Sequence, residues 1–505
     1  MTRRYLLLLC FCLIAFTSFG QNVGKDKNTR QYSQEELILL ERPSETQHTL
    51  KFEDGQQISF TAKAGYMLLK TEEGEPRAKV FYIAYTKNDV RNPADRPLTV
   101  AFNGGPGSSS VWLHMGALGP RRIVMDEVGN SLAPPYKVVD NEYSWLKWTD
   151  LVFVDPVMTG YSRPMEGVDK KEFLGFEEDI KAVGEFIQRY VTLNKRWASP
   201  KYLAGESYGT TRAAGLSDYL MDRYGMYLNG LVLISQITNF QTARFTRGND
   251  LPYILFLPTY AATAWYHKKL DPAFTDLRKL LDEVETFAMG EYASALLKGD
   301  QLTEAEEIRI AEKLSRYTGL SAAYIRQANL RPVIHKFCKE LRRDEGITVG
   351  RLDSRFTGKD YDDTGDRYEF DPSYDKTIYG PFTTAVYDHL GTYLNYLSEL
   401  PYEILTGRAR PWNYSNVQNQ YLNVAESLRS TMHKNPFMKV LICNGYYDLA
   451  TPYFATEYTL DHMFLDPALR KNITMKYFEA GHMMYIHQPS LEQFTRDVEE
   501  FYGGR

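Results

Sequence analysis

The sequence predicts an α/β fold in which helices cover both faces of a mostly parallel central sheet. Short, wholly apolar segments recur and end in polar or glycine-rich loops, as strands buried on both faces do. Amphipathic helical patterns separate these segments, and this alternation is typical of a three-layer architecture. The strand-like segments are 98–102, 151–154, 202–204, 231–234 and 440–443, and the clearest helical patterns are 177–190 and 211–224.

The rest of the chain completes the predicted organisation. Residues 48–88 alternate between apolar and polar side chains, which indicates an antiparallel start to the sheet. Residues 241–370 are charged and helix-rich, and we interpret them as a helical cap inserted over the active-site end of the sheet. We therefore expect an α/β core over 48–240 and 371–505, preceded by a loosely ordered lead-in over 21–47 with a short helix near its end.

Residues 1–20 have the pattern of a secretory signal peptide. Arg3 and Arg4 precede an apolar stretch over 5–16, which is too short to span a bilayer, and Gly20 is a small residue at the expected cleavage point. We expect export to the periplasm or the medium, with no stable membrane insertion after cleavage. A membrane anchor is the less favoured alternative.

Charge and cysteine content narrow the function classes. The formal net charge is −5 and no cluster of Lys and Arg occurs, so nucleic-acid binding is not expected. Only Cys338 and Cys443 lie beyond the predicted signal peptide, which allows one disulfide but no disulfide framework. The oligomeric state is left open.

A nucleophile elbow is the strongest chemical signal. Gly205-Glu206-Ser207-Tyr208-Gly209 matches Gly-x-Ser-x-Gly, with a predicted strand before it and a predicted helix after it. The small flanking residues allow a sharp turn that raises the serine hydroxyl above the sheet. A simple Gly-Ser turn is the alternative. The pattern favours an α/β-hydrolase fold with Ser207 as its nucleophile.

Two later loops supply the partners that such a serine needs. In this fold the chain order is serine, acid, histidine, and Asp448 and His482 both follow predicted strands in that order. His487 is a weaker candidate for the base. Asp150 and Asp155 are weaker candidates for the acid, because they precede the serine.

A glycine-rich loop follows the strand 98–102. Asn103-Gly104-Gly105-Pro106-Gly107 can bring backbone N–H groups close to a reacting carbonyl. No Lys-Ser or Lys-Thr follows, so a Walker-type phosphate loop is disfavoured. No metal-ligand spacing such as His-Glu-x-x-His occurs, and we expect neither a metal nor an organic cofactor.

Five short motifs span much of the chain. They are Asn103-Gly104-Gly105-Pro106-Gly107-Ser108-Ser109-Ser110, Tyr143-Ser144-Trp145, Thr159-Gly160-Tyr161-Ser162, Gly205-Glu206-Ser207-Tyr208-Gly209 and Gly481-His482-Met483. Together they closely resemble the serine carboxypeptidase family, over about 95–240 and 437–490. The resemblance implies the triad Ser207, Asp448 and His482 and an oxyanion hole at Gly105 and Tyr208. It also implies that Asn103 and Glu206 bind the substrate's terminal carboxylate.

This sequence departs from the family pattern at four points. Ser108 stands where a cysteine is common, and Ala101 where a tryptophan is frequent. The usual Asp-Gln-Pro is shortened to Asp155-Pro156, and the elbow continues as Gly209-Thr210 where Ala-Gly is usual. None of these changes removes a triad residue.

The resemblance implies a serine-type carboxypeptidase that acts through an acyl-enzyme on peptides with a free C-terminus. A carboxylate beside Glu206 is costly when both are ionised, so Glu206 is expected to be protonated when substrate binds. An esterase or acyltransferase on the same triad is a second hypothesis. A non-catalytic peptide-binding protein on a hydrolase scaffold is a third.

Overall fold

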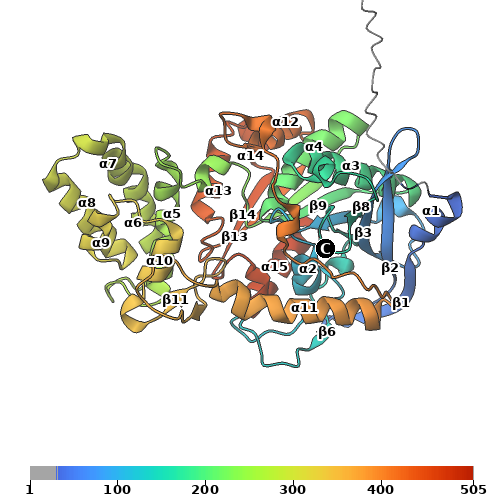
Figure 1. The fold of residues 1–505 in the computed structure, drawn as a ribbon, viewed down its shortest axis with the longest axis horizontal. Helices are drawn as coiled ribbons and strands as arrows, with labels where there is room; N and C mark the ends of the chain where they lie inside the picture. Colours follow the sequence, from blue (N-terminus) through green and yellow to red (C-terminus); the bar gives the residue numbers. More distant parts are fainter. Residues whose placement is uncertain (1–29, 31, 504–505) are drawn as a thin grey trace, which may run out of the picture.

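A ten-stranded sheet forms the centre of the computed structural model, which describes residue 30 and residues 32–503 (Figure 1). Its order is β1-β2-β3-β7-β4-β9-β10-β13-β14, with β8 also paired to β3. Strands β1, β2, β3 and β7 pair antiparallel, and those from β7 to β14 pair parallel. The strands are β1 Ser44–Lys51, β2 Gln57–Lys70, β3 Pro76–Lys87, β4 Leu98–Phe102, β7 Asp150–Val154, β8 Arg163–Pro164, β9 Lys201–Glu206, β10 Gly230–Ile234, β13 Lys439–Gly445 and β14 Ile473–Phe478.

The predicted mostly parallel sheet is confirmed, and its apolar strands are buried on both faces. Every residue of β4, β7 and β10 is buried. Alternate residues face two separate cores, as the two-residue side-chain period requires. Ala101 and Val232 lie in one core, whereas Val100 and Leu231 lie in the other.

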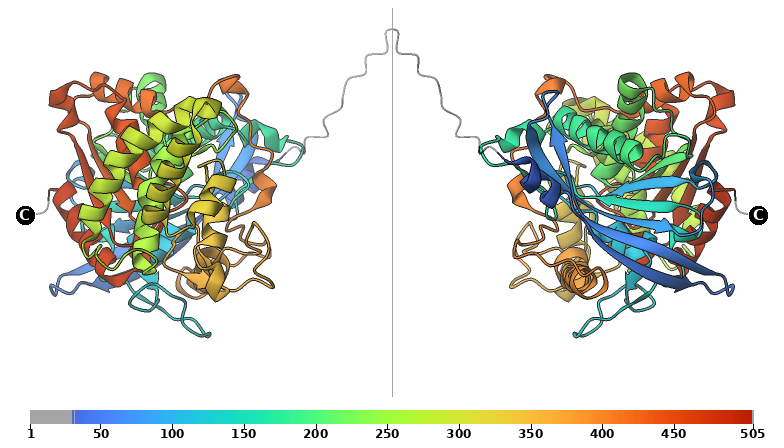
Figure 2. Two further views of the ribbon diagram at one scale, coloured as in Figure 1. Left: turned by 90° about the vertical axis from the view of Figure 1, so that its left-hand side faces the viewer. Right: turned by 90° about the vertical axis from the view of Figure 1, so that its right-hand side faces the viewer.

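Helices cover the two faces of the sheet (Figure 2). On one face α3 and α12 each pack against α4, and the other face carries α2, α11 and α15. Helix α13 links this core to the inserted helices through its contacts with α5. The bounds are α2 Val111–Leu113, α3 Phe176–Leu193, α4 Tyr208–Tyr224, α11 Tyr379–Asp388, α12 Ala425–Lys434, α13 Tyr453–Asp461, α14 Pro467–Arg470 and α15 Gln488–Phe501.

The segment between β10 and α11 forms a helical region with a hydrophobic cluster of its own (Figure 1). Helix α8 shows why this sequence is helical: Thr303 and Glu306 form a capping box, and Gly319 ends the helix in the left-handed conformation. The helices are α5 Leu251–Tyr266, α6 Leu277–Phe287, α7 Ala293–Lys298, α8 Glu304–Thr318, α9 Ala322–Gln327 and α10 Ile334–Glu340, followed by the two-residue strands β11 Thr348–Val349 and β12 Thr357–Gly358.

Residues between this helical region and β13 do not return directly to the sheet. A wide helical turn, η9 Pro372–Ile378, leads into α11, and η10 His389–Tyr393 follows it. The stretch 394–424 then contains only one-turn helices. This stretch packs across loops of the sheet, as described below.

The first helix of the described residues is α1, Gln34–Leu40, whose cap is Ser33 with Glu36. Strand β1 begins at Ser44, before residue 48, because its first residues also pair with β2. The short strands β5 Arg121–Ile123 and β6 Val138–Asp140 form a separate hairpin. The predicted signal peptide lies outside the described residues.

Two further sequence expectations concern disulfides and membranes. Cys338 and Cys443 are both buried and free. They belong to different hydrophobic clusters, so the disulfide that the sequence allowed is not formed. Across residues 32–503, none of the helices combines the length and the apolar composition needed to cross a membrane.

Candidate active site

Ser207 occupies a strained turn between β9 and α4. Its backbone has φ 59° and ψ −127°, a conformation that non-glycine residues rarely adopt. The flanking glycines permit this turn: a Cβ on Gly205 would lie 2.2 Å from the Gly209 carbonyl oxygen. Helix α4 begins at Tyr208, earlier than the predicted start at 211, so no spacer residue separates Ser207 from the helix N-terminus.

His482 and Asp448 form a buried hydrogen-bonded pair. His482 Nδ1 lies 2.7 Å from Asp448 Oδ2, and Asp448 also accepts hydrogen bonds from the backbone N–H groups of Ala450 and Thr451. An ionised carboxylate only accepts, so Nδ1 carries the proton and Nε2 is left as a base. Burial acts to lower the pKa of His482, but the charge and hydrogen bond of Asp448, together with the nearby Glu206, outweigh burial and raise that pKa.

The loop that carries His482 is held by residues from the inserted region. The His482 N–H donates to the Leu352 carbonyl at 2.7 Å, and the Gly481 N–H donates to Asp353 Oδ2 at 2.9 Å. Asp353 is itself fixed by a buried ion pair with Arg355. Sequence reasoning missed these residues, because they are far from His482 in the chain and belong to no recognisable motif.

The glycine-rich loop lies directly against the start of α4. A Cβ on Gly104 would lie 2.4 Å from the Tyr208 backbone nitrogen, and Gly105 has φ +104°, which favours glycine. This close approach brings the backbone of the loop to the N-terminus of α4, where free N–H groups favour a developing negative charge. The placement of Gly105 and Tyr208 suits the oxyanion hole expected of them.

Glu206 is a buried carboxyl group in the same pocket as Ser207. Its Oε1 accepts a hydrogen bond from Asn103 Nδ2 at 2.9 Å, and its Oε2 accepts one from the Tyr485 hydroxyl. Burial raises the pKa of Glu206 to about 7. Tyr485 was not among the expected site residues; no motif marks it beyond its position three residues after His482.

Asn103 supports Glu206 from behind and does not itself line the pocket. Its side chain is fully buried, and its Oδ1 accepts the Leu113 N–H at 3.1 Å. Its backbone carbonyl accepts a hydrogen bond from Arg212 Nη1 at 2.6 Å. Arg212 is also buried and pairs with Asp179 of α3 at 2.7 Å.

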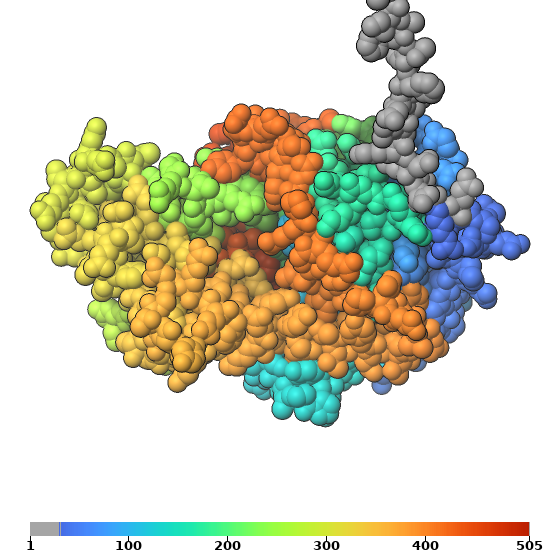
Figure 3. Space-filling model, in the orientation of Figure 1, coloured from blue at the N-terminus to red at the C-terminus, as the bar shows by residue number. Residues whose placement is uncertain are grey.

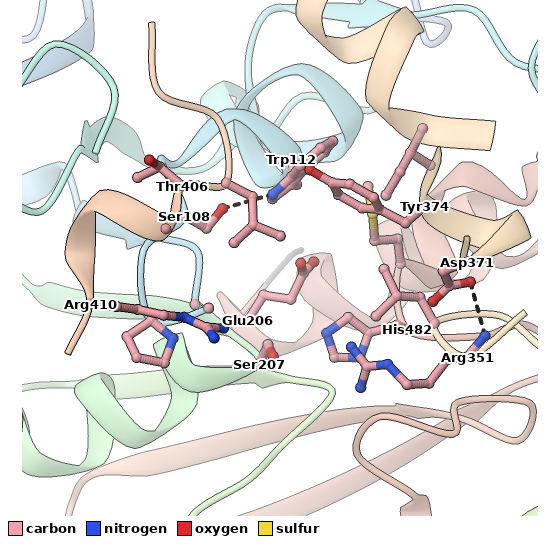
Figure 4. A pocket seen from close by; sticks show the side chains of 18 of the residues that line it. Ser108, Trp112, Glu206, Ser207, Arg351, Asp371, Tyr374, Thr406, Arg410 and His482 are labelled. Carbon is pink, nitrogen blue, oxygen red and sulfur yellow. Dashed lines mark hydrogen bonds between the residues drawn. The ribbon is translucent and has the colours of Figure 1, made fainter. Parts of the chain in front are cut away.

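These groups meet at a cavity of about 530 Å³. Figure 4 shows Ser207, Glu206 and His482 converging at its centre, and Figure 3 shows the surface hollowed between the inserted region and the stretch near residue 400. Asp448 lies behind His482. Outside the glycine loop and the Gly481-His482-Met483 motif, none of the remaining lining residues had been predicted to belong to the site. The remaining lining is Gly104, Gly105, Pro106, Ser108, Trp112, Arg351, Leu352, Tyr368, Asp371, Tyr374, Ile378, Leu405, Thr406, Gly407, Arg410 and Met483.

The rival residues have other partners. His487 Nδ1 contacts the Ser490 hydroxyl at 2.8 Å and lies outside the cavity lining. Asp150 is the first residue of β7, at the end of the sheet away from Ser207, and it pairs there with Arg96 and Arg196. Asp155 accepts the Ser110 N–H, and burial raises its pKa to about 7.

Two departures from the family pattern have structural consequences. Ser108, in the place of the usual cysteine, accepts a hydrogen bond from Trp112 Nε1 at 2.8 Å and donates to the Ile404 carbonyl. The Ser109 N–H donates to the same Ile404 carbonyl at 2.9 Å, so hydrogen bonds connect the glycine loop to residue 404. Ala101 is fully buried within β4.

Among residues 32–503 no group of three or more His, Cys, Asp or Glu is arranged to hold a metal ion.

The parallel sheet with its elbow serine defines an α/β-hydrolase. Comparison with known proteins gives the family: the family described as "Serine carboxypeptidase" matches residues 53–490, and the chain therefore belongs to it. Among curated relatives, serine carboxypeptidase-like 5 of Arabidopsis thaliana is 26% identical over 59% of this chain and 68% of its own length. Serine carboxypeptidase-like 8 of the same plant is 26% identical over 49% of this chain, which spans 58% of that relative.

A solved structure shows the same fold. A prohormone-processing carboxypeptidase from Saccharomyces cerevisiae superposes with a TM-score of 0.55 at 18% identity, covering 88% of this chain and 91% of the other. At that identity the similarity establishes the architecture. The family and the fold make this chain a hydrolase of the serine carboxypeptidase family.

Proposed function

We propose that this chain is a serine-type carboxypeptidase, which removes the last residue of peptides with a free C-terminus. Its catalytic residues are Ser207, Asp448 and His482. The observation that carries the proposal is the buried Glu206, whose pKa is raised to about 7, in the same cavity as Ser207. A neutral carboxyl group can donate a hydrogen bond to a substrate carboxylate, and a hydrolase acting on internal bonds has no need for such a group.

The geometry supports a two-step acyl transfer. Ser207 Oγ attacks the last peptide carbonyl while His482 Nε2 takes its proton, and N–H groups at Gly105 and Tyr208 stabilise the resulting oxyanion. The C–N bond then breaks as His482 gives the proton to the leaving amine. Water attacks the acyl-enzyme, and its proton passes through His482 back to Ser207 Oγ. One water is consumed for each amino acid released.

Substrate binding follows from the residues beside Ser207. The protonated Glu206 donates to the terminal carboxylate, and Asn103 holds the Glu206 carboxyl group in place through its amide. Asn103 still has a second amide hydrogen, which can serve the same carboxylate if the side chains adjust on binding. Tyr485 fixes the other Glu206 oxygen.

The decisive test measures amino-acid release from a blocked dipeptide with a free and with an amidated C-terminus, between pH 4 and 8. We expect release from the free acid alone, and its loss in Ser207→Ala by about 10⁴-fold or more. Equal turnover of both forms would support the esterase or amidase alternative. No turnover, with no labelling of Ser207 by a serine-reactive phosphonate, would support a non-catalytic binding protein.

Export and domain organisation belong to the same proposal. Removal of residues 1–20 would deliver the enzyme to the periplasm or the medium, where free peptides are its substrates. N-terminal sequencing of the mature protein tests this, with a start at Gln21 as the expected result. The inserted residues 241–370 would act as a cap whose inner edge holds the His482 loop.

A further inference from the structure

A segment that no motif marked crosses the active site. Residues 403–413, hereafter the strap, pack against both loops that form the oxyanion hole. Its start bonds with the loop after β7 and with the glycine loop, and its end bonds with the segment before α3. These contacts are the bridges Gly160 with Glu403 and Ser108 with Leu405, the bond from the Thr406 N–H to Gly107, and the bond from the Asn413 N–H to Leu174.

The strap is also fixed to the helix that follows the nucleophile. Trp412 Nε1 donates to the Tyr208 hydroxyl at 3.0 Å, and the two rings meet edge to face. A Cβ on Gly107 would lie 2.8 Å from the Thr406 carbonyl oxygen, so strap and glycine loop are in direct contact. The strap is therefore held at both ends, and the residues between its anchors have a defined position over the cavity.

Arg410 is the strap residue that enters the cavity. Figure 4 shows its guanidinium pointing toward Ser207 from the side opposite His482. Within the part of the chain that the structure describes, Arg410 forms no ion pair, whereas the neighbouring Arg408 pairs with Glu403 at 2.8 Å. An arginine placed beside a nucleophile without a carboxylate partner is suited to bind an anion of the substrate.

Other charges in the cavity favour an acidic substrate as well. The lining contains two carboxylic acids, Glu206 and Asp371. Burial raises the pKa of Glu206 to about 7, so this group is neutral at lower pH. Arg351 enters from the side of His482, and only its backbone N–H contacts Asp371. The cavity thus carries two guanidinium groups, and Asp371 is the only carboxyl group in its lining besides the neutral Glu206.

The position of Arg410 relative to His482 selects one residue of the substrate. His482 must reach the leaving amine, so the released residue lies on the His482 side of Ser207. The acyl part of the substrate then extends to the opposite side, where Arg410 lies. The lining there contains the aromatic residues Trp112 and Tyr374 (Figure 4) and Met483, the neighbour of His482 in the chain, so the released side chain should meet apolar or aromatic groups.

We infer that this enzyme prefers Asp or Glu as the penultimate residue of its peptide substrates, through an ion pair with Arg410. The inference rests on the proposed carboxypeptidase activity. It sets the substrate class as peptides that end in an acidic residue followed by an apolar or aromatic one.

The test compares kcat/KM for acetyl-Glu-Phe and acetyl-Gln-Phe at pH 6, since glutamine keeps the shape of glutamate and removes its charge. We expect the glutamate substrate to be favoured about fivefold, as a partly exposed ion pair allows. The ratio should fall to about one in Arg410→Gln. It should remain in Arg408→Gln, the matched control on the strap outside the cavity. Arg410→Glu should instead favour acetyl-Lys-Phe over acetyl-Gln-Phe.

The outcomes separate this inference from the proposed function. Cleavage of acetyl-Gln-Phe without any preference for glutamate would overturn the role of Arg410 and leave the carboxypeptidase intact. Loss of the preference in Arg351→Gln, with Arg410→Gln retaining it, would also overturn it. An equal loss on both substrates in Arg410→Gln would assign Arg410 to the terminal carboxylate. If neither dipeptide is cleaved by the wild-type protein, the proposed function itself fails.

Thermal unfolding of Arg410→Gln checks that this variant is folded. If it is unstable, Arg410→Lys replaces it; this variant keeps the charge and should retain part of the preference for glutamate.

Discussion

In the proposed carboxypeptidase, Glu206 is the residue whose chemistry separates the site from that of a general serine hydrolase. A carboxyl group beside the nucleophile would repel an anionic substrate if it were ionised. Burial raises the pKa of Glu206 to about 7, so the group keeps its proton at lower pH. Asn103 and Tyr485 fix its two oxygens. The acid is therefore neutral and oriented in the pH range where the terminal carboxylate of a peptide is fully ionised.

The first prediction concerns the pH dependence of Glu206→Gln. In the wild-type enzyme KM for a free-acid dipeptide should rise as pH passes about 7, because Glu206 loses the proton that it donates. Glutamine keeps a neutral donor at every pH, so this rise should be absent. KM and kcat measured from pH 4 to 9 test the prediction, and an unchanged KM profile would contradict it.

The acid side of the same profile provides an internal control. Activity should fall at low pH in both enzymes, because protonated His482 cannot accept the serine proton. The negative charge of Glu206 contributes to the raised pKa of His482, after burial and the larger effect of Asp448. Glu206 keeps its proton below about pH 7, however, so the acid limb should lie at nearly the same pH in Glu206→Gln. Loss of the acid limb would indicate that another group is the base.

Asp448 sets the tautomer of His482, and its replacement by asparagine tests that role. The asparagine amide can donate to His482 Nδ1, which then holds no proton, and Nε2 becomes protonated and useless as a base. We expect kcat to fall by about 10⁴-fold with little change in KM. Thr451→Val removes a hydroxyl that also donates to Asp448 and should cost far less. A loss below tenfold in Asp448→Asn would assign the acid elsewhere.

At the scale of elements, α3 and α4 support the substrate site through a buried ion pair. Arg212 of α4 pairs with Asp179 of α3 and donates to the Asn103 backbone carbonyl at 2.6 Å. Its guanidinium also lies over the rings of Phe102 and Tyr208. The helices are thereby coupled to the residue that orients Glu206, which makes Arg212 a positioning residue.

Removing both charges together tests this coupling without leaving an unpaired buried charge. The double variant Arg212→Met, Asp179→Leu should fold with stability within about 2 kcal/mol of wild type, because apolar replacement of a buried pair is often nearly neutral. We expect KM for free-acid dipeptides to rise several-fold while kcat changes less. Arg212→Lys keeps a hydrogen-bond donor at this position, so its KM should rise less than that of the double variant. A fall in kcat alone would point to damage at the elbow.

The elements that sequence could predict are those fixed by local contacts. The strands β4 and β9, the elbow and the glycine loop depend on burial and on glycines that no Cβ could replace, such as Gly104 and Gly205. These constraints act between neighbouring residues and leave a clear trace in the sequence. The helix α4 still began earlier than expected, because the turn at Ser207 is tighter than propensities indicate.

The rest of the site depends on long-range packing, which leaves no comparable trace. Arg410 reaches the cavity because the strap bonds to Ser108 and Gly160, hundreds of residues away in the chain. Asp353 holds the His482 loop through a similarly distant bond. An arginine or aspartate in such a segment looks like any surface charge, so neither could be singled out from the sequence.

At the scale of the whole molecule, the sheet and the inserted region complete one site together. The sheet supplies Ser207, the glycine loop and the pair Asp448 with His482. The inserted region supplies the carbonyl and carboxylate that hold the His482 loop. Within that region, the Thr263 hydroxyl of α5 contacts Ser354, so the same segment is tied to the inserted helices. Catalytic geometry and the packing of the inserted helices are therefore linked.

Two buried carboxyl groups should make the stability of the whole molecule depend on pH. Burial raises the pKa of Glu206 and of Asp155 to about 7, above the values of 4.5 and 3.8 for exposed groups. Each folded-state proton is held more tightly than in the unfolded chain. The stabilisation is therefore complete below about pH 4 and is lost as pH rises toward 7.

We expect the free energy of unfolding, measured with urea, to be lower at pH 8 than at pH 5 by on the order of 3 kcal/mol for each group. Other titrating groups also change the free energy of unfolding with pH, so the test compares the pH dependence of the variants with that of the wild type. Glu206→Gln with Asp155→Asn should flatten the dependence between pH 5 and 8, because neither side chain then titrates. Asp300→Asn, at an exposed position, should leave the slope unchanged. If the double variant keeps the wild-type slope, the two carboxyl groups are ionised in the folded protein, and Glu206 cannot act as the neutral donor to a substrate carboxylate.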